Sequence, residues 1–205
     1  MRIAHSTQSL SSDDSMALQE PERRGGARIH TVMRVGRVVA MQDEGLARIK
    51  NISDQGAQLR LHIPVLVGET LTLELSEDVQ ITGRAVWISG NECGLQFSQN
   101  IDCGELLTRL AHCSEQGSRP VRLSVSTTAV TRGENGLRLA KVTDVSQRGM
   151  KLQHDGSLTE GLIIKISLPS GRERFGVVRW SKDSVAGIML LKPFSAEDLG
   201  SARNL

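Results

Sequence analysis

The sequence NISDQGAQLRL, residues 51–61, returns in outline as DVSQRGMKL, residues 144–152. Each segment carries Asn or Asp, then Ser two positions later, and then Gly three positions after the Ser. After the glycine, apolar and polar residues alternate, which is typical of a half-buried β-strand. The shared outline predicts that one structural unit occurs twice in the chain.

An offset of 93 residues aligns the two halves without a gap, since it brings Ser53 onto Ser146 and Gly56 onto Gly149. The same offset pairs Asn51 with Asp144, Leu59 with Leu152, Gly68 with Gly161, Leu75 with Leu168, Gly83 with Gly176, Trp87 with Trp180 and Gly94 with Gly187. Chance does not place both tryptophans and so many glycines in one register. We therefore expect a tandem of two domains of roughly 90 residues each, and not a solenoid.

Each copy is expected to contain six β-strands. In the first copy Leu59, Leu61 and Ile63 alternate with polar residues, and short turns with Gly, Pro or Asp separate such segments. Evenly spaced short strands favour a closed barrel, because closure removes exposed sheet edges. Trp87 and Trp180 are expected to occupy equivalent places and to be structural, because a buried Trp covers a large apolar area, whereas a Trp exposed beside a ligand would contribute to binding instead. The strands expected in the first copy are 28–40, 46–52, 57–63, 69–75, 79–89 and 92–98.

A short helix is expected after each barrel. The stretch IDCGELLTRLAHC places its apolar residues on one helical face, and Asp102 with Glu105 has the spacing of a capping box. In PFSAEDLGSARNL, Ser195 and Asp198 repeat that spacing. The expected fold class is mainly β, with two tandem six-stranded barrels, each followed by a short C-terminal helix. The expected organisation is a disordered tail 1–20, a first domain 21–113, a linker 114–118 and a second domain 119–205.

Composition excludes several classes of function. The formal net charge is +2 and aromatic residues make up 2% of the chain. We therefore expect no nucleic-acid partner, which would require a concentrated basic face with stacking aromatics. There is no apolar run of membrane-spanning length and no signal-peptide core near residue 1, so we expect a cytoplasmic protein without direct membrane insertion. Cys93, Cys103 and Cys113 lack zinc-site spacing, so no metal and no cofactor are expected.

The sequence does not predict an enzyme. It contains no glycine-rich nucleotide loop of the dinucleotide or Walker type and no cluster of metal-ligating residues. The histidines are scattered and show no nucleophile signature. They are His5, His30, His62, His112 and His154.

A second feature lies upstream of the first repeat, in PERRGGARIH, residues 21–30. Arg23, Arg24 and Arg28 crowd into this segment, with two glycines among them. The guanidinium group binds phosphate oxygens, or the O6 and N7 atoms of guanine, through two parallel hydrogen bonds. Taken alone, the arginines are typical of a solvated charge run, and the Asn/Asp-x-Ser-x-x-Gly motif is typical of a structural turn. Together they favour a site for a phosphate-bearing ligand.

The combination resembles the signature of the PilZ domain family, which is Arg-x-x-x-Arg followed downstream by Asp/Asn-x-Ser-x-x-Gly. In this chain RGGAR supplies Arg24 and Arg28, and NISDQG follows after 22 intervening residues. The stretch WISGNECGLQF also resembles the closing strand pair of the family. The resemblance covers nearly all of residues 21–113 and, more loosely, 118–198. It implies two tandem PilZ-like barrels and a bacterial receptor for cyclic di-GMP, which is a second messenger.

The resemblance also implies a set of ligand-binding residues. The two motif arginines would hold phosphates and guanine edges, and a third arginine would add a contact. The Asn and the Ser would contact a guanine, and the Gly would keep the turn open beside it. Ligand binding would change the conformation and signal to a protein partner, whereas the alternative is a ligand-free PilZ-like adaptor that acts only through protein contacts. The implied residues are Arg23, Arg24, Arg28, Asn51, Ser53 and Gly56.

The second copy departs from the family pattern upstream of its turn, where the sequence is GSRPVRLSV. Ser118 stands four positions before Arg122, where the pattern has an arginine. The Asp, Ser and Gly of the turn are all present, so the second copy is either a weak second site or a structural copy that docks a partner. The residues of the candidate second site are Arg119, Arg122, Asp144, Ser146 and Gly149.

Overall fold

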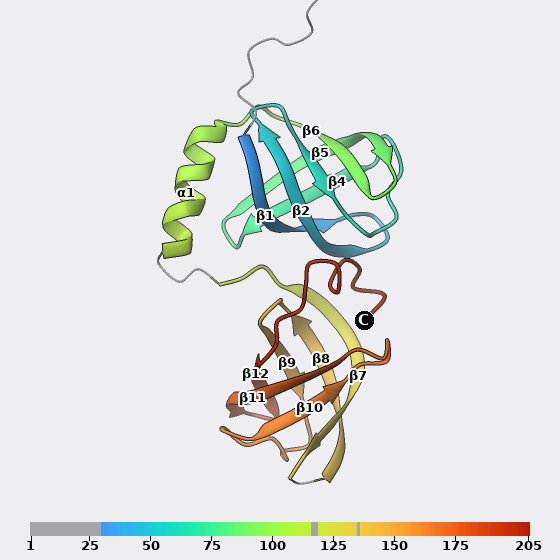
Figure 1. Ribbon diagram of the computed structural model, residues 1–205, viewed down its shortest axis with the longest axis vertical. Coiled ribbons are helices and arrows are strands. Elements are labelled where there is room, and N and C mark those ends of the chain that lie inside the picture. Colours follow the sequence, from blue (N-terminus) through green and yellow to red (C-terminus); the bar gives the residue numbers. More distant parts are fainter. Residues whose placement is uncertain (1–29, 116–118, 135) are drawn as a thin grey trace, which may run out of the picture.

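The computed structural model describes residues 30–115, 119–134 and 136–205 (Figure 1). The expected tail 1–20 and the arginines Arg23, Arg24 and Arg28 lie outside the described residues. Two β-barrels follow one another along the chain, one above the other in Figure 1, and a helix lies beside the first.

The first barrel is a closed antiparallel barrel in which the strands follow the order β1-β2-β3-β6-β5-β4. Its six strands agree with the six expected from the sequence, with shifts of a few residues at their ends. They are β1 (His30–Val39), β2 (Glu44–Ser53), β3 (Gly56–Arg60), β4 (Thr70–Ser76), β5 (Val79–Ser89) and β6 (Glu92–Phe97).

The second barrel repeats this topology, with the equivalent order β7-β8-β9-β12-β11-β10 and closure of β10 onto β7. The prediction of two tandem six-stranded barrels is therefore confirmed. The strands are β7 (Leu123–Gly133), β8 (Gly136–Val145), β9 (Gly149–Gln153), β10 (Ile163–Ser167), β11 (Glu173–Lys182) and β12 (Val185–Leu190).

Each barrel has its own core, built mainly from Leu, Ile and Val side chains. The alternation of inward and outward residues holds along the strands, and β5 shows it over eight consecutive positions. Leu59 in β3 and Leu152 in β9 occupy equivalent places and are both fully buried. The repeat in the sequence thus corresponds to two cores, and the second core also receives Leu46 from β2 of the first barrel.

The helix α1 (Cys103–Glu115) follows the first barrel as expected. Asp102 caps it, because its carboxylate accepts a hydrogen bond from the backbone N–H of Glu105 at 2.8 Å. Cys103, Leu106 and Leu110 are buried in the core of the first barrel. The apolar face of α1 predicted from the sequence is therefore the face that packs against the first barrel.

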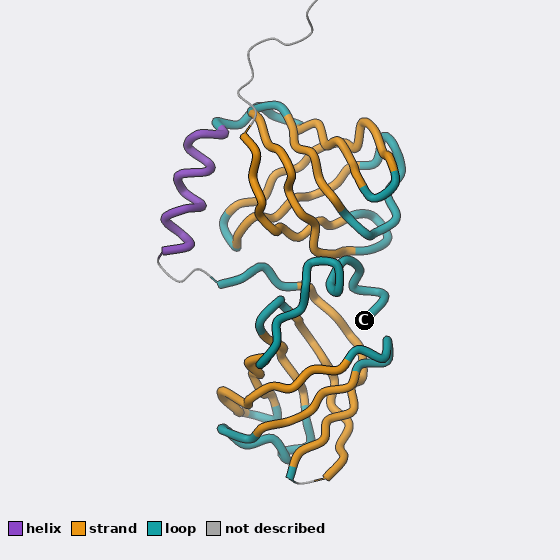
Figure 2. The backbone as a smooth tube through the Cα atoms, in the orientation of Figure 1, coloured by secondary structure: helices purple, strands orange, loops and turns teal. Residues whose placement is uncertain are grey.

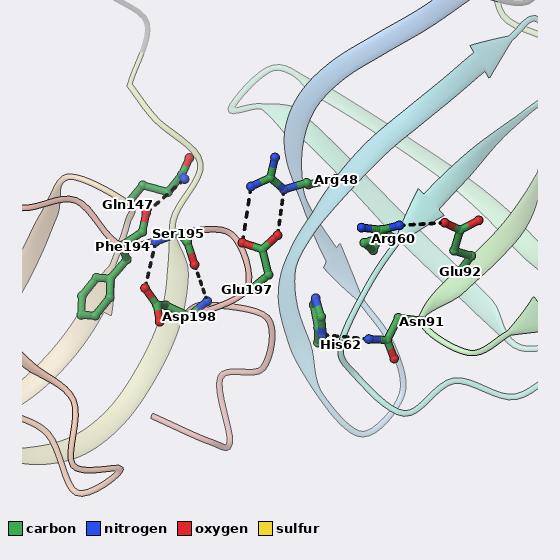
Figure 3. Close-up of polar contacts among 10 residues, drawn as sticks. All are labelled: Arg48, Arg60, His62, Asn91, Glu92, Gln147, Phe194, Ser195, Glu197 and Asp198. Carbon is green, nitrogen blue, oxygen red and sulfur yellow. Dashed lines mark hydrogen bonds and ion pairs between the residues drawn. The ribbon is translucent and has the colours of Figure 1, made fainter.

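The helix expected after the second barrel is absent, and that prediction was wrong. Ser195 and Asp198 do form the reciprocal capping contacts, at 3.0 Å each, but only turns follow them (Figures 2 and 3). The C-terminal segment, residues 191–205, uses its backbone groups on the first barrel instead. Leu46 in β2 donates its N–H to the carbonyl of Leu199 at 2.8 Å. A tertiary contact has replaced the helical hydrogen bonds.

The C-terminal segment joins the two barrels (Figure 3). Arg48, on the outer face of β2, forms an ion pair with Glu197 at 3.0 Å. Gly45 and Gly200 cross so closely that a Cβ atom on Gly45 would lie 2.0 Å from the Gly200 carbonyl oxygen. The segment is therefore fastened to β2, the strand that ends in the Asn51–Ser53 turn.

The two tryptophans occupy equivalent places, and both are partly exposed. Trp87 is 41% exposed and Trp180 is 45% exposed. Each ring lies on the outside of its barrel, against the glycine seven residues later. A Cβ atom on Gly94 would lie 2.0 Å from Nε1 of Trp87, and one on Gly187 would lie 2.1 Å from Nε1 of Trp180. The glycines are required because the rings lie where side chains would be.

Candidate functional site

The first candidate site is built on the hairpin between β2 and β3. Asn51 and Ser53 stand at the end of β2, and Ser53 pairs with Gly56 at the start of β3. The Ser53 hydroxyl donates to the carbonyl of Gly56 at 3.3 Å, and Ser53 remains partly accessible. The motif therefore forms a tight hairpin whose polar side chains lie at the barrel surface.

A network of polar side chains orients Asn51. Its amide Nδ2 donates to Oε1 of Gln58 at 2.8 Å, and the amide of Gln58 donates to Glu92 at 2.9 Å. Hydrogen bonds from Lys50 and then Arg60 hold the pKa of Glu92 below its usual value, so this carboxylate is charged at neutral pH. The network fixes the amide side of Asn51 and leaves its carbonyl oxygen as an acceptor for a ligand.

Gly56 also has a structural role in the barrel. It is not among the glycines with positive φ. A Cβ atom on it would lie 2.5 Å from the carbonyl oxygen of Leu95 in β6. Gly56 therefore permits the close approach of β3 to β6.

A shallow cavity of about 210 Å³ lies against this hairpin. Sequence reasoning placed Asn51, Ser53 and Gly56 near a ligand, and all three line the cavity. It missed Gln58 and Trp87, which line the cavity as well. Gln58 was identifiable as the cross-strand partner of Asn51. Trp87 was expected to be structural, and its place beside the hairpin comes from the exposure of its ring on the barrel surface.

The start of β1 lies beside the same hairpin. His30 pairs with Ile52, and Thr31 pairs with Asn51. The chain upstream of β1 carries the arginine motif, whose placement lies outside the described residues. The pairing of β1 with β2 nevertheless places His30, where that segment joins the barrel, next to the Asn51–Ser53 turn.

The second candidate site lies on the equivalent hairpin of the second barrel, beside a larger cavity of about 570 Å³. All five residues proposed from the sequence line it, and three further cations and Trp180 join them. The family motif does not specify the positions of these further cations. The five expected residues are Arg119, Arg122, Asp144, Ser146 and Gly149, and the added cations are Arg148, Lys151 and Arg179.

The polar groups of this second turn have partners within the protein. Arg122 forms an ion pair with Asp144, and Arg119 lies 3.9 Å from Glu77 of the first barrel. Ser146 is buried, and its hydroxyl both donates to the carbonyl of Gly149 at 3.2 Å and accepts from the N–H of Gly149 at 3.1 Å. A ligand would have to compete with these contacts.

Residues 30–115, 119–134 and 136–205 contain no group of three or more His, Cys, Asp or Glu residues that could hold a metal ion. In the same part of the chain, no helix is long and apolar enough to cross a membrane.

Comparison with solved structures finds remote likenesses. PlzA of Borreliella burgdorferi in complex with c-di-GMP is 12% identical, with a TM-score of 0.38, and the match covers 82% of this chain and 85% of that chain. MrkH of K. pneumonia in its c-di-GMP complex is 13% identical, with a TM-score of 0.29, over 82% and 89% of the two chains. YcgR from Escherichia coli in complex with c-di-GMP is 11% identical, with a TM-score of 0.28, over 80% and 76%. Similarity at this level does not determine function.

The comparison with curated proteins finds no match. A comparison with family models does: the model described as the PilZ domain matches residues 22–116. This range contains the arginine motif, the first barrel with its Asn51–Gly56 hairpin, and α1. The part of the chain that forms the first barrel and α1 is therefore similar to a PilZ domain.

Proposed function

We propose that the chain is a cyclic di-GMP receptor and that its first barrel binds the dinucleotide. The observation that carries this proposal is the register of β1, which starts opposite Ile52. Arg28 precedes His30 by two residues, so covalent connection keeps their Cα atoms within about 7 Å of each other. β1, which follows the arginine motif in the sequence, therefore begins beside the hairpin motif.

The chemistry assigned to each residue follows from its hydrogen-bonding groups. Arg24 and Arg28 hold phosphate oxygens and guanine edges with their planar guanidinium forks, and Arg23 adds a further contact. Asn51 offers its carbonyl oxygen to the amino and imino donors of guanine, and Ser53 offers a hydroxyl. The exposed face of Trp87 supplies an apolar wall beside them.

The second barrel has a lesser role in nucleotide binding in this proposal. Arg122 would have to leave Asp144 to meet a phosphate, and Ser146 would have to leave Gly149. The second barrel transmits the signal to a protein partner instead. The ion pair between Arg48 and Glu197 connects the two barrels, so a change at the nucleotide site reaches the second barrel through it.

The test is calorimetric titration of the whole chain with cyclic di-GMP. The wild type should bind, and Arg28→Ala should lose at least about tenfold in affinity, because charged hydrogen bonds contribute about 1.5–3 kcal/mol. Arg84→Ala is the matched control, since Arg84 is an exposed arginine on β5 with no side-chain partner among the described residues. Equal losses in the two variants would show that only general charge matters.

The alternative is a ligand-free adaptor, and thermal melting separates it from a receptor. A receptor at 100 times its dissociation constant gains about 2.7 kcal/mol of stability, whereas an adaptor gains none. A nonspecific nucleic-acid binder that uses the same arginines is distinguished by salt. Its affinity would fall steeply with ionic strength and follow chain length instead of guanine content.

A further inference from the structure

The second barrel carries large apolar side chains on the outside of its sheet. Ile163 in β10 is 58% exposed, Phe175 in β11 is 54% exposed and Met189 in β12 is 42% exposed. Leu191, directly after β12, is 57% exposed. Single exposed apolar residues are common on soluble proteins, but several that lie together mark an interaction site.

Strand pairing shows that these residues do lie together. Val177 in β11 pairs with Ile163 on one side and with Met189 on the other. Phe175 is two residues from Val177 and therefore on the same face of the strand. Leu191 donates its N–H to the carbonyl of Phe175 at 2.9 Å. We call this group the β10–β12 patch; β10 and β11 run across the lower barrel in Figure 1.

The first barrel shows what the same positions carry when they face only water. The offset of 93 residues that aligns the two halves gives a polar residue at each of the five places, and all five are exposed. They are Thr70, Thr82, Arg84, Gln96 and Ser98, in the order Ile163, Phe175, Val177, Met189 and Leu191. The barrel itself therefore does not need apolar residues there, and the β10–β12 patch requires another explanation.

The charges around the patch indicate what covers it. Glu173 is the only carboxylate in β10, β11 and β12, and it is paired with Lys165 at 2.8 Å. Arg179, further along β11, and Arg148, which lines the cavity next to Met189, have no side-chain partner among the described residues. Two copies of this face would bring like charges together, which costs free energy. An acidic surface is complementary to it.

We propose that the β10–β12 patch is the docking site for a protein partner whose own surface has an apolar centre and an acidic rim. The proposal rests on the role in signalling to a partner proposed above, but it does not depend on nucleotide binding. Burial of the patch removes apolar area from water, and the cations fix the orientation of the partner. Met189 also lines the cavity beside the Asp144–Gly149 hairpin, so the partner would lie next to that turn.

The test uses the whole chain and a variant in which the patch receives the residues of the first barrel: Ile163→Thr, Phe175→Thr, Met189→Gln and Leu191→Ser. The matched control is Leu66→Ser with Val67→Thr, which removes two exposed apolar side chains of the first barrel. A first probe is bis-ANS, a dye that combines apolar rings with negative charge. The patch variant should lose at least about tenfold in affinity for the dye, and the control should keep it.

A second measurement identifies the occupant. Proteins retained by the wild type from a cell extract, with and without cyclic di-GMP, are identified, purified and titrated against each variant. A partner that binds the wild type and the control, loses at least about tenfold on the patch variant and on Arg179→Glu, and weakens with salt supports the proposal. Cyclic di-GMP affinity should be unchanged in the patch variant, so failure here is distinguishable from failure of the receptor assignment.

Three results would overturn the proposal. One is dye binding that is equal in the wild type and the patch variant. Another is a concentration-dependent dimer in sedimentation velocity that the patch variant abolishes, since the occupant would then be a second copy of the chain. The third is that no retained protein distinguishes the patch variant from the control, in either nucleotide condition.

Discussion

The two barrels share one topology and differ on their outer surfaces. Leu46 in β2 and Leu139 in β8 are equivalent in the repeat, yet Leu46 is 1% exposed and Leu139 is 68% exposed. The first is covered by the C-terminal segment, which packs it into the core of the second barrel. The comparison shows that the inward-facing residues repeat between the two barrels, whereas the contacts of the outward-facing residues differ.

The β2–β3 and β8–β9 hairpins also share a backbone motif and differ in the contacts of their side chains. In the first barrel Asn51 is held by the neutral amide of Gln58, and in the second barrel Asp144 is held by the charged Arg122. The residue that corresponds to Gln58 is Lys151. One backbone motif therefore has a mostly neutral lining in one copy and a strongly charged one in the other, and this difference separates the proposed roles of the two sites.

The largest expected effect tests whether the two cores are independent. Leu59→Ala and Leu152→Ala each remove a fully buried side chain, and each should cost about 2–5 kcal/mol of unfolding free energy. Each variant should lower the melting temperature of its own barrel most, as followed by hydrogen exchange of β3 and β9 amides. Loss of protection in both barrels from either substitution would show that they unfold as one unit.

The next effect concerns the glycine of each hairpin. A Cβ atom would lie 2.5 Å from a carbonyl oxygen at Gly56 and 2.9 Å from one at Gly149. Both contacts require the strands to move, so Gly56→Ala should cost about 1–3 kcal/mol and Gly149→Ala less. Chemical denaturation of the two variants measures the difference. A greater cost at Gly149 would mean that β9 and β12 are held more rigidly than β3 and β6.

The sequence predicted the fold well because the fold is determined by inward residues that repeat. Alternation along Leu59, Leu61 and Ile63 and the register of the paired glycines are local patterns, and they specified the strands and α1. The missing second helix had a correct capping pair, Ser195 and Asp198, but its backbone groups bind β2 of the other barrel. Such a contact between residues far apart in the sequence leaves no local pattern.

The candidate sites were predictable in part, for a related reason. Asn51 and Ser53 belong to a motif of fixed spacing, whereas Trp87 reaches the same cavity from β5 through barrel closure. In the second cavity, Arg179 likewise comes from another strand, β11. Trp87 is exposed because its ring lies over Gly94 of the neighbouring strand β6, and residue spacing alone does not reveal this contact.

The proposed difference between the two nucleotide sites is tested by substitution in each. Arg24→Ala should weaken cyclic di-GMP binding at least about tenfold, which is about 1.4 kcal/mol, and Arg24→Lys should also weaken it because Lys lacks the planar fork. Ser53→Ala should have a milder effect, since a neutral hydrogen bond contributes about 1 kcal/mol. Arg122→Ala should change affinity little. Calorimetric titration at fixed salt measures all four, and loss of binding only in Arg122→Ala would place the site in the second barrel.

The smallest expected effect concerns the ion pair of Arg48 in β2 with Glu197, which joins the two barrels. The backbone hydrogen bond of Glu197 and then its contact with Arg48 lower the pKa of this carboxyl below its usual value. A carboxyl whose pKa is lower in the folded state stabilises the fold above its unfolded pKa. That stability is lost as the pH falls through the folded value, so the effect should appear in acid, below about pH 4.5. Because the side chains of Arg48 and Glu197 are each 44% exposed, it should stay below about 1 kcal/mol.

The measurement is the free energy of unfolding between pH 3 and pH 7 for the wild type, Glu197→Gln and Glu160→Gln, in low salt. Glu197→Gln should be less stable than the wild type at pH 7 and should approach it in acid, where the wild-type carboxyl is protonated as well. Glu160→Gln is the matched control, because Glu160 is exposed and has no side-chain partner among the described residues. If the two variants show the same pH dependence, Glu197 does not fasten the barrels. The coupling would then rest on the Leu46–Leu199 hydrogen bond and the crossing of Gly45 with Gly200, neither of which titrates.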